Sequence, residues 1–111
     1  MAKNLRLTDT VVIAISGTVS ASLTLDNSRI PLAIVTPTAL TGTSFNFNGS
    51  IDGTSFYPIY NESTLYAVTV GTSAGRHIAL SRAAFEGVRY LQVVSTSAEA
   101  AARTIKVVSG E

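Results

Sequence analysis

The sequence predicts an all-β fold: a single antiparallel β-sandwich of the jelly-roll type, with about eight or nine short strands and at most one short helical turn, near residues 82–85. Three observations lead to this prediction. Short segments rich in β-branched and aromatic residues recur along the chain at fairly regular spacing. Several of them alternate apolar and polar residues, which is the period of a strand with one buried face. Clusters of Gly, Asn, Asp and Ser separate these segments and are typical of turns.

A hairpin forms the centre of the predicted sheet. Residues 44–48 alternate polar and aromatic side chains, and residues 56–60 are rich in aromatic residues. Between them lie Asp52 and Gly53. An Asp-Gly pair favours a tight type I′ turn, because that turn needs positive φ at both central positions and these residues tolerate it. We therefore interpret the pair as the turn that fixes this hairpin rather than as a ligand-binding loop.

The N-terminal part of the chain predicts three strand segments. Residues 5–8 alternate and predict a short first strand, and the β-branched run of residues 11–15 favours extended structure. Residues 19–25 alternate strictly between apolar and small polar side chains, which predicts a half-buried strand. The apolar face that we expect to be buried consists of Val19, Ala21, Leu23 and Leu25.

The middle of the chain continues the pattern. Residues 30–35 predict a strand, and Pro31 within it indicates a strand start or a sheet edge, because proline cannot donate a ladder hydrogen bond. Residues 36–42 are interpreted as a connection that crosses from one sheet to the other. Two further strands are predicted at residues 66–70 and 76–80.

A single helical turn is expected after these strands. Ser81 is suited to cap residues 82–85, and Gly87 is suited to end the turn. Such a turn would place Phe85 on the end of the core.

The C-terminal part predicts two more strands. Residues 88–95 form the strongest strand pattern of this half, and residues 103–108 close the chain as a strand at an exposed sheet edge, with Ile105 and Val107 facing inward. Residues 98–102 have helix-forming composition but span only about one turn, so a surface loop is expected there.

Length and composition limit the class of protein. With 111 residues the chain fits one domain, and we divide it into an N-terminal arm or first strand (residues 1–10) and a β-sandwich domain (residues 11–109). Cysteine is absent from the sequence, which excludes disulfides and thiolate metal sites. The net charge is +1 and the basic residues are scattered, so nucleic acid is not the expected partner.

Charged residues make up only 14% of the chain, against roughly 25% in typical soluble domains. A small domain has much surface per residue, so this shortage leaves neutral or apolar surface. One interpretation is that the surface makes contacts within an oligomer or a lattice. The alternative is that the abundant Ser and Thr residues keep the surface soluble without charge.

The sequence contains no apolar run of the roughly 20 residues that a membrane-spanning helix needs. Its N-terminus also lacks the apolar core and cleavage site of a signal peptide. We therefore expect no membrane partner, and synthesis in a cytoplasm.

Candidate chemistry is sparse, and no catalytic, cofactor or metal site is expected. His77 is the only histidine, and no Gly-x-Ser-x-Gly motif accompanies the many serines. Four carboxylates fall at predicted turns: Asp26, Asp52, Glu62 and Glu86. A calcium site built from such carboxylates is conceivable. Their role in turn formation explains them more simply.

The aromatic residues permit two interpretations. Exposed rings among Tyr57, Tyr60 and Tyr66 would form a platform on which a sugar could stack. Alternating aromatic residues in a sandwich are more often core residues or cross-strand pairs.

Two motifs carry a resemblance to known families. One runs from Phe45 to Tyr60 with the pattern F-x-F-x-G-S-x-D-G-x-x-F-x-P-x-Y, and the other is the segment from Phe85 to Val93, FEGVRYLQV. Together they resemble small structural proteins from the head and tail gene clusters of tailed bacteriophages. They are also similar to the hairpin and strand of discoidin, or galactose-binding-like, jelly rolls. The resemblance covers roughly residues 30 to 108, and the chain lacks the cysteine pair and recognisable ligand loops of discoidin lectins.

The resemblance implies a non-enzymatic virion component of the capsid decoration or cement type. Its expected location is the capsid surface, and its expected partners are the major capsid protein, further copies of itself, or both. A carbohydrate-binding module on a fibre or baseplate and a ring-forming tail or head-completion protein are the alternatives. The expected partner-binding residues are Leu5, Arg6 and Leu7 in the N-terminal arm, with Tyr57, Tyr60 and Tyr66.

Overall fold

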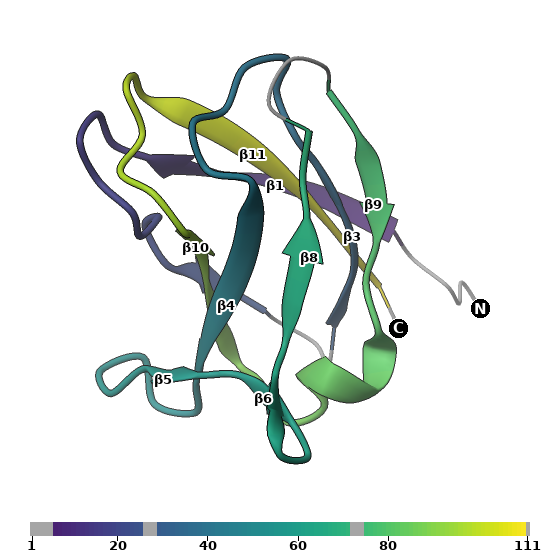
Figure 1. The fold of residues 1–111 in the computed structure, drawn as a ribbon. Helices are drawn as coiled ribbons and strands as arrows, with labels where there is room; N and C mark the ends of the chain where they lie inside the picture. Colours follow the sequence, from purple (N-terminus) through teal and green to yellow (C-terminus); the bar gives the residue numbers. More distant parts are fainter. Residues whose placement is uncertain (1–5, 26–28, 72–74, 111) are drawn as a thin grey trace.

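The structure, a computed structural model, describes residues 6–25, 29–71 and 75–110. These residues form two antiparallel β-sheets packed face to face, with a small two-stranded sheet at one end (Figure 1). The prediction of a single antiparallel β-sandwich is confirmed.

The first sheet has the strand order β1-β11-β3-β9. Its strands are β1 (Arg6–Ile13), β11 (Arg103–Gly110), β3 (Ile30–Val35) and β9 (His77–Ala79). The pairing of β1 with β11 runs without interruption from Arg6 opposite Gly110 to Ile13 opposite Arg103.

The second sheet has β4 near its centre. Its strands are β2 (Leu23–Thr24), β10 (Tyr90–Ser95), β4 (Ser44–Ser50), β5 (Tyr57–Pro58) and β8 (Ala67–Thr69). β10 lies along one edge of β4, whereas β8 and β5 share the other edge. β8 pairs with residues 44–46 and β5 with residues 48–49. The small third sheet pairs β6 (Tyr60–Asn61) with β7 (Thr64–Leu65).

The strand order is that of a jelly roll. The described residues form eleven strands, of which β5, β6 and β7 make a short excursion between β4 and β8. Numbering the remaining eight (eleven minus three) from one to eight along the chain gives sheets of order 1-8-3-6 and 2-7-4-5. Eight strands alternating between two sheets in this way form the double-sheet jelly roll. The jelly-roll prediction is therefore confirmed.

The core lies between the two sheets and follows the alternation of the sequence. Phe45 and Phe47 of β4 and Leu91 and Val93 of β10 are fully buried, and each is separated from the next by an outward residue. The first sheet contributes buried residues at the same period of two, namely Val11, Ile13, Ile105 and Val107. This period is the reason why the strands could be placed from the sequence.

The predicted helical turn is present as a 3-10 turn, η1 (Arg82–Phe85). The Phe85 ring is fully buried and meets the Phe47 and Tyr66 rings edge to face, at centroid distances of 5.3 and 5.4 Å. Gly87, at φ 82°, follows the turn. The prediction of a side-chain cap by Ser81 is wrong, because its hydroxyl makes no capping bond; its N–H donates instead to the Tyr66 hydroxyl at 2.8 Å.

Two strand predictions at the N-terminus need correction. Residues 6–13 form one continuous strand instead of two short ones, and residue 5 lies outside the described part. Within residues 19–25 only Leu23 and Thr24 form a strand. Val19 and Ser20 each form only an isolated bridge. The predicted buried face holds at Leu23 and Leu25, but Val19 is 43% exposed and Ser20 is buried, the reverse of the prediction at that end. The Ser20 hydroxyl donates to Ala21 O and accepts from Val93 N–H, which satisfies it in the interior.

The position of the last strand also differs from the prediction. β11 is an interior strand, paired with β1 on one side and β3 on the other. Thr104 and Lys106 are exposed because they face outward from the sandwich, and not because they lie at a sheet edge.

Pro31 lies near the start of the interior strand β3, opposite Ser109, where the pairing with β11 shifts register. A bulge tolerates proline for the same reason that an edge does.

We expect Phe85→Ala to lower the free energy of unfolding by about 3–5 kcal/mol, because it removes a buried ring and leaves a cavity against Phe47 and Tyr66. Urea unfolding followed by fluorescence measures the change. Ile51→Ala is the matched control: Ile51 is 74% exposed, so a change within about 0.5 kcal/mol is expected. Equal losses in both variants would contradict this account of the core.

Candidate docking surface

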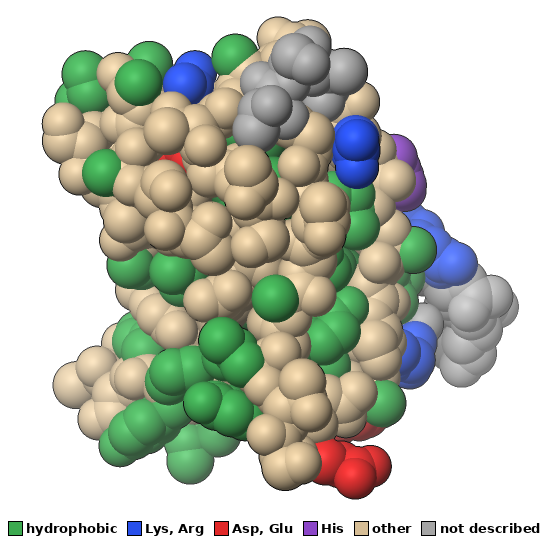
Figure 2. All heavy atoms as spheres, viewed as in Figure 1, with side chains coloured by type: hydrophobic (Ala, Val, Ile, Leu, Met, Phe, Trp, Pro, Cys, Tyr) green, Lys and Arg blue, Asp and Glu red, His purple; other side chains and the backbone are tan. Residues whose placement is uncertain are grey.

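Exposed apolar side chains gather on the excursion from β4 to β6. The exposed fractions of Ile51, Tyr57 and Tyr60 are 74%, 68% and 55%. Figure 2 shows hydrophobic side chains crowded at the lower left, where β5 lies in Figure 1. We define Ile51, Tyr57, Pro58 and Tyr60 as the tyrosine patch. Apolar clusters edged by polar groups commonly mark interaction surfaces.

An open cleft of about 460 Å³ lies against this patch. Ile51, Tyr57 and Pro58 line it from the excursion. Glu86, Gly87 and Val88, which follow η1, also line it. Part of the patch is therefore concave, which allows a partner side chain to be enclosed on more than one side.

Hydrogen bonds shape the loop that carries Ile51. The Ser50 hydroxyl accepts from the N–H groups of Asp52 and Gly53, at 3.2 and 2.9 Å, and donates to Asp52 Oδ1. Asp52 Oδ1 also accepts from the N–H groups of Thr54 and Ser55, at 2.9 and 3.0 Å. These bonds lower the pKa of the Asp52 carboxyl, with those from Ser55 and Thr54 contributing most. The carboxylate is thus a structural acceptor for the loop.

This geometry corrects the predicted type I′ turn. Among the described residues other than glycine, only Ser16 and Glu62 have positive φ, so Asp52 does not adopt the conformation that the turn requires. β5 pairs with β4 at Gly49 opposite Tyr57, which leaves a wider loop between the strands. Gly53 does have positive φ, at 79°, and a Cβ there would lie 3.2 Å from the Tyr90 ring. At Gly53 the loop backbone therefore lies close against the Tyr90 ring.

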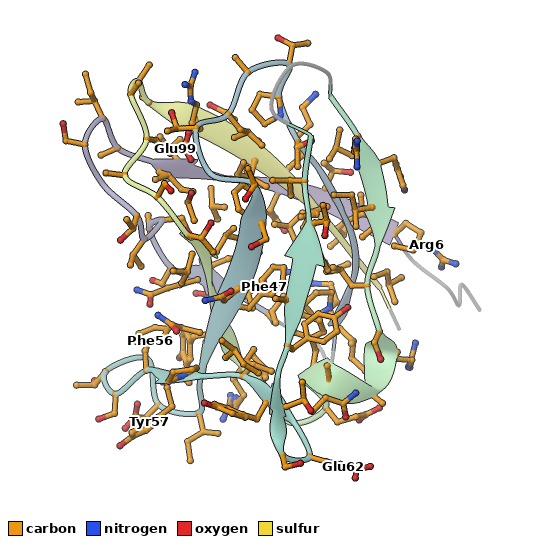
Figure 3. The ribbon with its side chains drawn as sticks, in the orientation of Figure 1. Arg6, Phe47, Phe56, Tyr57, Glu62 and Glu99 are labelled. Carbon is orange, nitrogen blue, oxygen red and sulfur yellow. The ribbon has the colours of Figure 1, made fainter. Side chains whose placement is uncertain are left out.

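The exposed negative charge of the described chain lies at the same end. Five acidic residues are described, of which Asp9 and Glu99 form ion pairs with Arg29 and Arg103. The other three lie on the Ser50–Ser55 loop, on the β6–β7 turn and just after η1: Asp52, Glu62 and Glu86. Figure 3 shows Glu62 projecting at the bottom of the molecule, where Figure 2 shows acidic side chains. The tyrosine patch is accordingly edged by carboxylates.

A second cleft, of about 630 Å³, also uses Glu86, Gly87 and Val88 as lining residues. Arg29, Arg89 and Tyr90 are among its other lining residues, so it is more polar than the first. Arg29 is buried, and its guanidinium donates to Asp9 Oδ2 at 3.1 Å and to the Ser109 hydroxyl at 2.7 Å. This arginine therefore joins the start of β3 to β1 and β11.

The structure separates the predicted partner-binding residues into three groups. Tyr57 and Tyr60 lie on the tyrosine patch. Tyr66 is partly buried and packs against the core residues Phe47 and Phe85, so the structure does not bring it to the surface formed by the other two tyrosines.

The N-terminal group lies elsewhere. Arg6 and Leu7 belong to β1, where they pair with Gly110 and Ser109, and Leu5 lies outside the described residues. Figure 3 shows Arg6 on the opposite side of the molecule from Tyr57.

Glu99 is a buried charged residue that the sequence prediction missed. It is 1% exposed and lies in the segment predicted as a surface loop. One carboxylate oxygen accepts from Thr41 N–H at 2.8 Å and from Arg103 Nε at 3.0 Å. The other accepts from Gly42 N–H at 3.0 Å and from the Ser95 hydroxyl at 2.7 Å. The spacing of Glu99 and Arg103, four residues apart, was the one available signal.

The Glu99 network closes the end of the sandwich opposite the tyrosine patch, as the labels in Figure 3 show. Its backbone also bonds to the β1–β2 connection, through Ser16 N–H and Gly17 O. A side chain at Gly42 would collide with the Ser95 hydroxyl. The connection of residues 36–43 can therefore lie this close to Ser95 only because residue 42 is a glycine. With every carboxylate lone pair engaged, Glu99 is a structural group and not a reactive one.

Within the described residues there is no cluster of three or more His, Cys, Asp and Glu side chains that could hold a metal ion. His77 lies exposed on β9, one of the two edge strands of the first sheet. The described part of the chain also contains no helix that is long and apolar enough to cross a membrane.

The geometry defines a jelly-roll domain with one closed end and one end that carries an apolar, carboxylate-edged surface. No protein family and no curated protein matches the sequence. Among solved structures, the fold is similar to the crystal structure of the SPBc2 prophage-derived protein YomS, with a TM-score of 0.56. The likeness covers 100% of this chain and 99% of that one at 10% sequence identity. It establishes a shared fold over the whole length.

Gly53→Val is expected to destabilise the protein by about 1–3 kcal/mol, because a β-branched residue is strained at positive φ and its Cβ would press on Tyr90. Asp52→Asn should be nearly silent, since the amide oxygen still accepts from Thr54 and Ser55. Thermal unfolding of both variants provides the comparison. A large loss in Asp52→Asn with none in Gly53→Val would refute the structural role given to this loop.

Stability is expected to fall in acid because of Glu99. Burial alone raises the pKa of its carboxyl, but the hydrogen bonds from Thr41, Ser95, Gly42 and Arg103 outweigh burial and lower the pKa from 4.5 to about 2. The ionised form therefore stabilises the fold by about 3 kcal/mol above pH 4.5, and this contribution is lost as the pH falls from 4.5 towards 2.

Urea unfolding at a series of pH values measures this loss. Glu99→Gln should lower stability at neutral pH by about 2–4 kcal/mol and flatten the acid dependence, because an NH₂ group would face two donors. Glu62→Gln, on an exposed turn, is the control and should change neither quantity. An unchanged acid profile in Glu99→Gln would exclude the proposed cause.

Proposed function

We propose that this chain is a non-enzymatic structural protein of a tailed-bacteriophage particle. We further propose that it decorates the capsid by binding the major capsid protein through the tyrosine patch. The observation that carries the proposal is a jelly roll that resembles a prophage-derived protein over its whole length. Jelly rolls are a common architecture of viral capsid and lectin domains.

The tyrosine patch has the properties of a protein-docking surface. Tyrosine is enriched among residues that contribute most to binding, because its large ring loses little side-chain entropy on contact. Tyr57 lies on β5, which is held by pairing with Gly49 of β4. Tyr60 lies on the β6–β7 hairpin. A partner would therefore meet rings that the backbone already positions.

The composition supports a role in which many weak contacts act together. Only 14% of the residues are charged, so the surface offers few repulsive interactions to neighbouring subunits. Copies arranged on a regular shell gain strength through multivalency even when each contact is weak. Decoration of the capsid surface uses both properties, with synthesis in the host cytoplasm before assembly.

Two alternatives make different use of the same end of the molecule. A ring-forming tail or head-completion protein would be present at a small fixed copy number. A carbohydrate-binding module would stack a sugar on Tyr57, which is exposed and lines the first cleft, or on Tyr60, which is exposed as well.

Purified virions of the phage that encodes the chain test the proposal directly. Hundreds of copies per particle are expected for decoration, whereas about six or twelve would indicate a ring. Absence of the chain from particles would overturn the proposal. Binding to a glycan array that disappears in Tyr60→Ala would favour the carbohydrate-binding alternative.

The Tyr57→Ala/Tyr60→Ala double variant is expected to reduce occupancy of particles that lack the native protein by roughly tenfold or more. Occupancy is measured by quantitative mass spectrometry after sedimentation of the particles. Ile15→Ser is the matched control, because Ile15 is 65% exposed but lies in the connection that joins the Glu99 end. Equal occupancy for the double variant and the wild type would place the docking surface elsewhere.

A further inference from the structure

The outer edge of β1 is a long sheet edge that is covered over only part of its length. β1 is the terminal strand of the first sheet and has eight residues. The chain covers its C-terminal part, where Ser20 bridges to Ile13 and Ala21 N–H donates to Val12 O. From Leu7 to Thr10 the described residues provide no such cover.

The bond at Val12 shows which backbone groups point outward. Val12 O bonds to Ala21, so it points away from β11. In an antiparallel pair, the N–H and C=O of one residue point to the same side, and successive residues alternate. The N–H and C=O of Thr8 and Thr10 therefore also point away from β11. Neither Thr8 nor Thr10 has a hydrogen-bond partner for these groups in the part of the chain that the structure describes.

The other described sheet edges are much shorter. β9 ends the first sheet with three residues, and β2 ends the second with two. The remaining edge is divided between β5 and β8, which have two and three residues. Short edge strands are a common protection against unwanted pairing, as are proline and lysine on an edge. β1 has neither residue and is not short.

We propose that the β1 edge binds the β1 edge of a second copy, antiparallel about a two-fold axis at Thr8, so that two four-stranded sheets become one continuous sheet. Among the registers centred on a residue whose backbone groups point outward, two constraints select this one. Centring the pair at Thr10 would place the second strand beside Val12. The Ala21 segment already lies there, because Ala21 N–H bonds to Val12 O. Centring it at Arg6 would place two arginines directly opposite, which is destabilising. At Thr8, each Arg6 lies opposite a Thr10 instead.

The side chains at this centre suit a symmetric contact. Thr8 and Thr10 are exposed, and a Thr–Thr cross-strand pair is favourable. Asp9, the acidic residue of the strand, is held in the ion pair with Arg29 and would not oppose its counterpart. The β1 edge of one copy thus contacts the same edge of the other copy, as a two-fold interface requires. The proposal does not depend on the tyrosine patch or on the proposed virion role, because it concerns a different surface.

The first test uses the absence of natural cysteines from the sequence. In Thr8→Cys the two thiols face the same side of the sheet, with Cα atoms about 5.5 Å apart. Dibromobimane, which becomes strongly fluorescent on bridging two nearby thiols, should crosslink them. In Thr10→Cys the two thiols are offset by four residues, roughly 14 Å, and should not be bridged. Bridging of Thr10→Cys at the rate of Thr8→Cys, or of neither variant, would overturn the register.

The second test measures association by sedimentation equilibrium over concentrations up to the millimolar range. The wild type should approach twice the 11.6 kDa chain mass. Thr8→Pro removes an N–H that points away from β11, so the variant should fold but associate roughly tenfold or more weakly. Thr8→Val keeps the N–H and should associate like the wild type. A wild type that stays monomeric, or a folded Thr8→Pro that associates equally well, would overturn the proposal. If Thr8→Pro does not fold, the dibromobimane crosslinking of Thr8→Cys compared with Thr10→Cys tests the proposal in its place.

Discussion

The packing of two sheets through alternate residues is the constraint on which the rest of this molecule depends. Each long strand must direct every second side chain into the space between the sheets, and Phe45, Phe47, Leu91 and Val93 do so on the second sheet. The edge-to-face contacts of Phe85 with Phe47 and Tyr66 then fix the 3-10 turn against the end of the core. Because the inward positions are apolar, the outward positions are free to be small and neutral. The low charge of the chain is therefore compatible with a well-packed interior.

The two ends of the sandwich differ in how their backbone groups are satisfied. At one end, Glu99 accepts four hydrogen bonds and joins the connections between the sheets through a single carboxylate. At the other end, the excursion from β4 to β8 is held by local bonds to Ser50 and Asp52, and its apolar side chains remain exposed. The hydrogen bonds to Glu99 close the first end, whereas the second end presents exposed apolar side chains. We propose a docking function for the second end for this physical reason.

The edges of the sheets add a second kind of surface. Backbone groups at an edge bind through hydrogen bonds rather than apolar contact, so they favour an extended partner of defined register. The tyrosine patch, in contrast, suits a partner that inserts side chains into a cleft. An assembly that uses both would join copies of the chain through β1 and attach them to another protein through the patch. The two surfaces lie on different parts of the molecule, so neither contact would obstruct the other.

The sequence by itself determined the class of fold, because its alternating segments and turn residues reflect local rules that act within a few residues. The strand at residues 30–35, the helical turn at residues 82–85 and the buried position of Phe85 were all predictable in this way. The tertiary structure alone decided which sheet edges are open, since β11 is covered by β1 and not by any neighbour in sequence. It also decided that Ser20 is inside and Val19 outside, because Val93 supplies a hydrogen-bond donor there. The burial of Glu99 depends likewise on donors about 57 residues away along the chain, which no local pattern reveals.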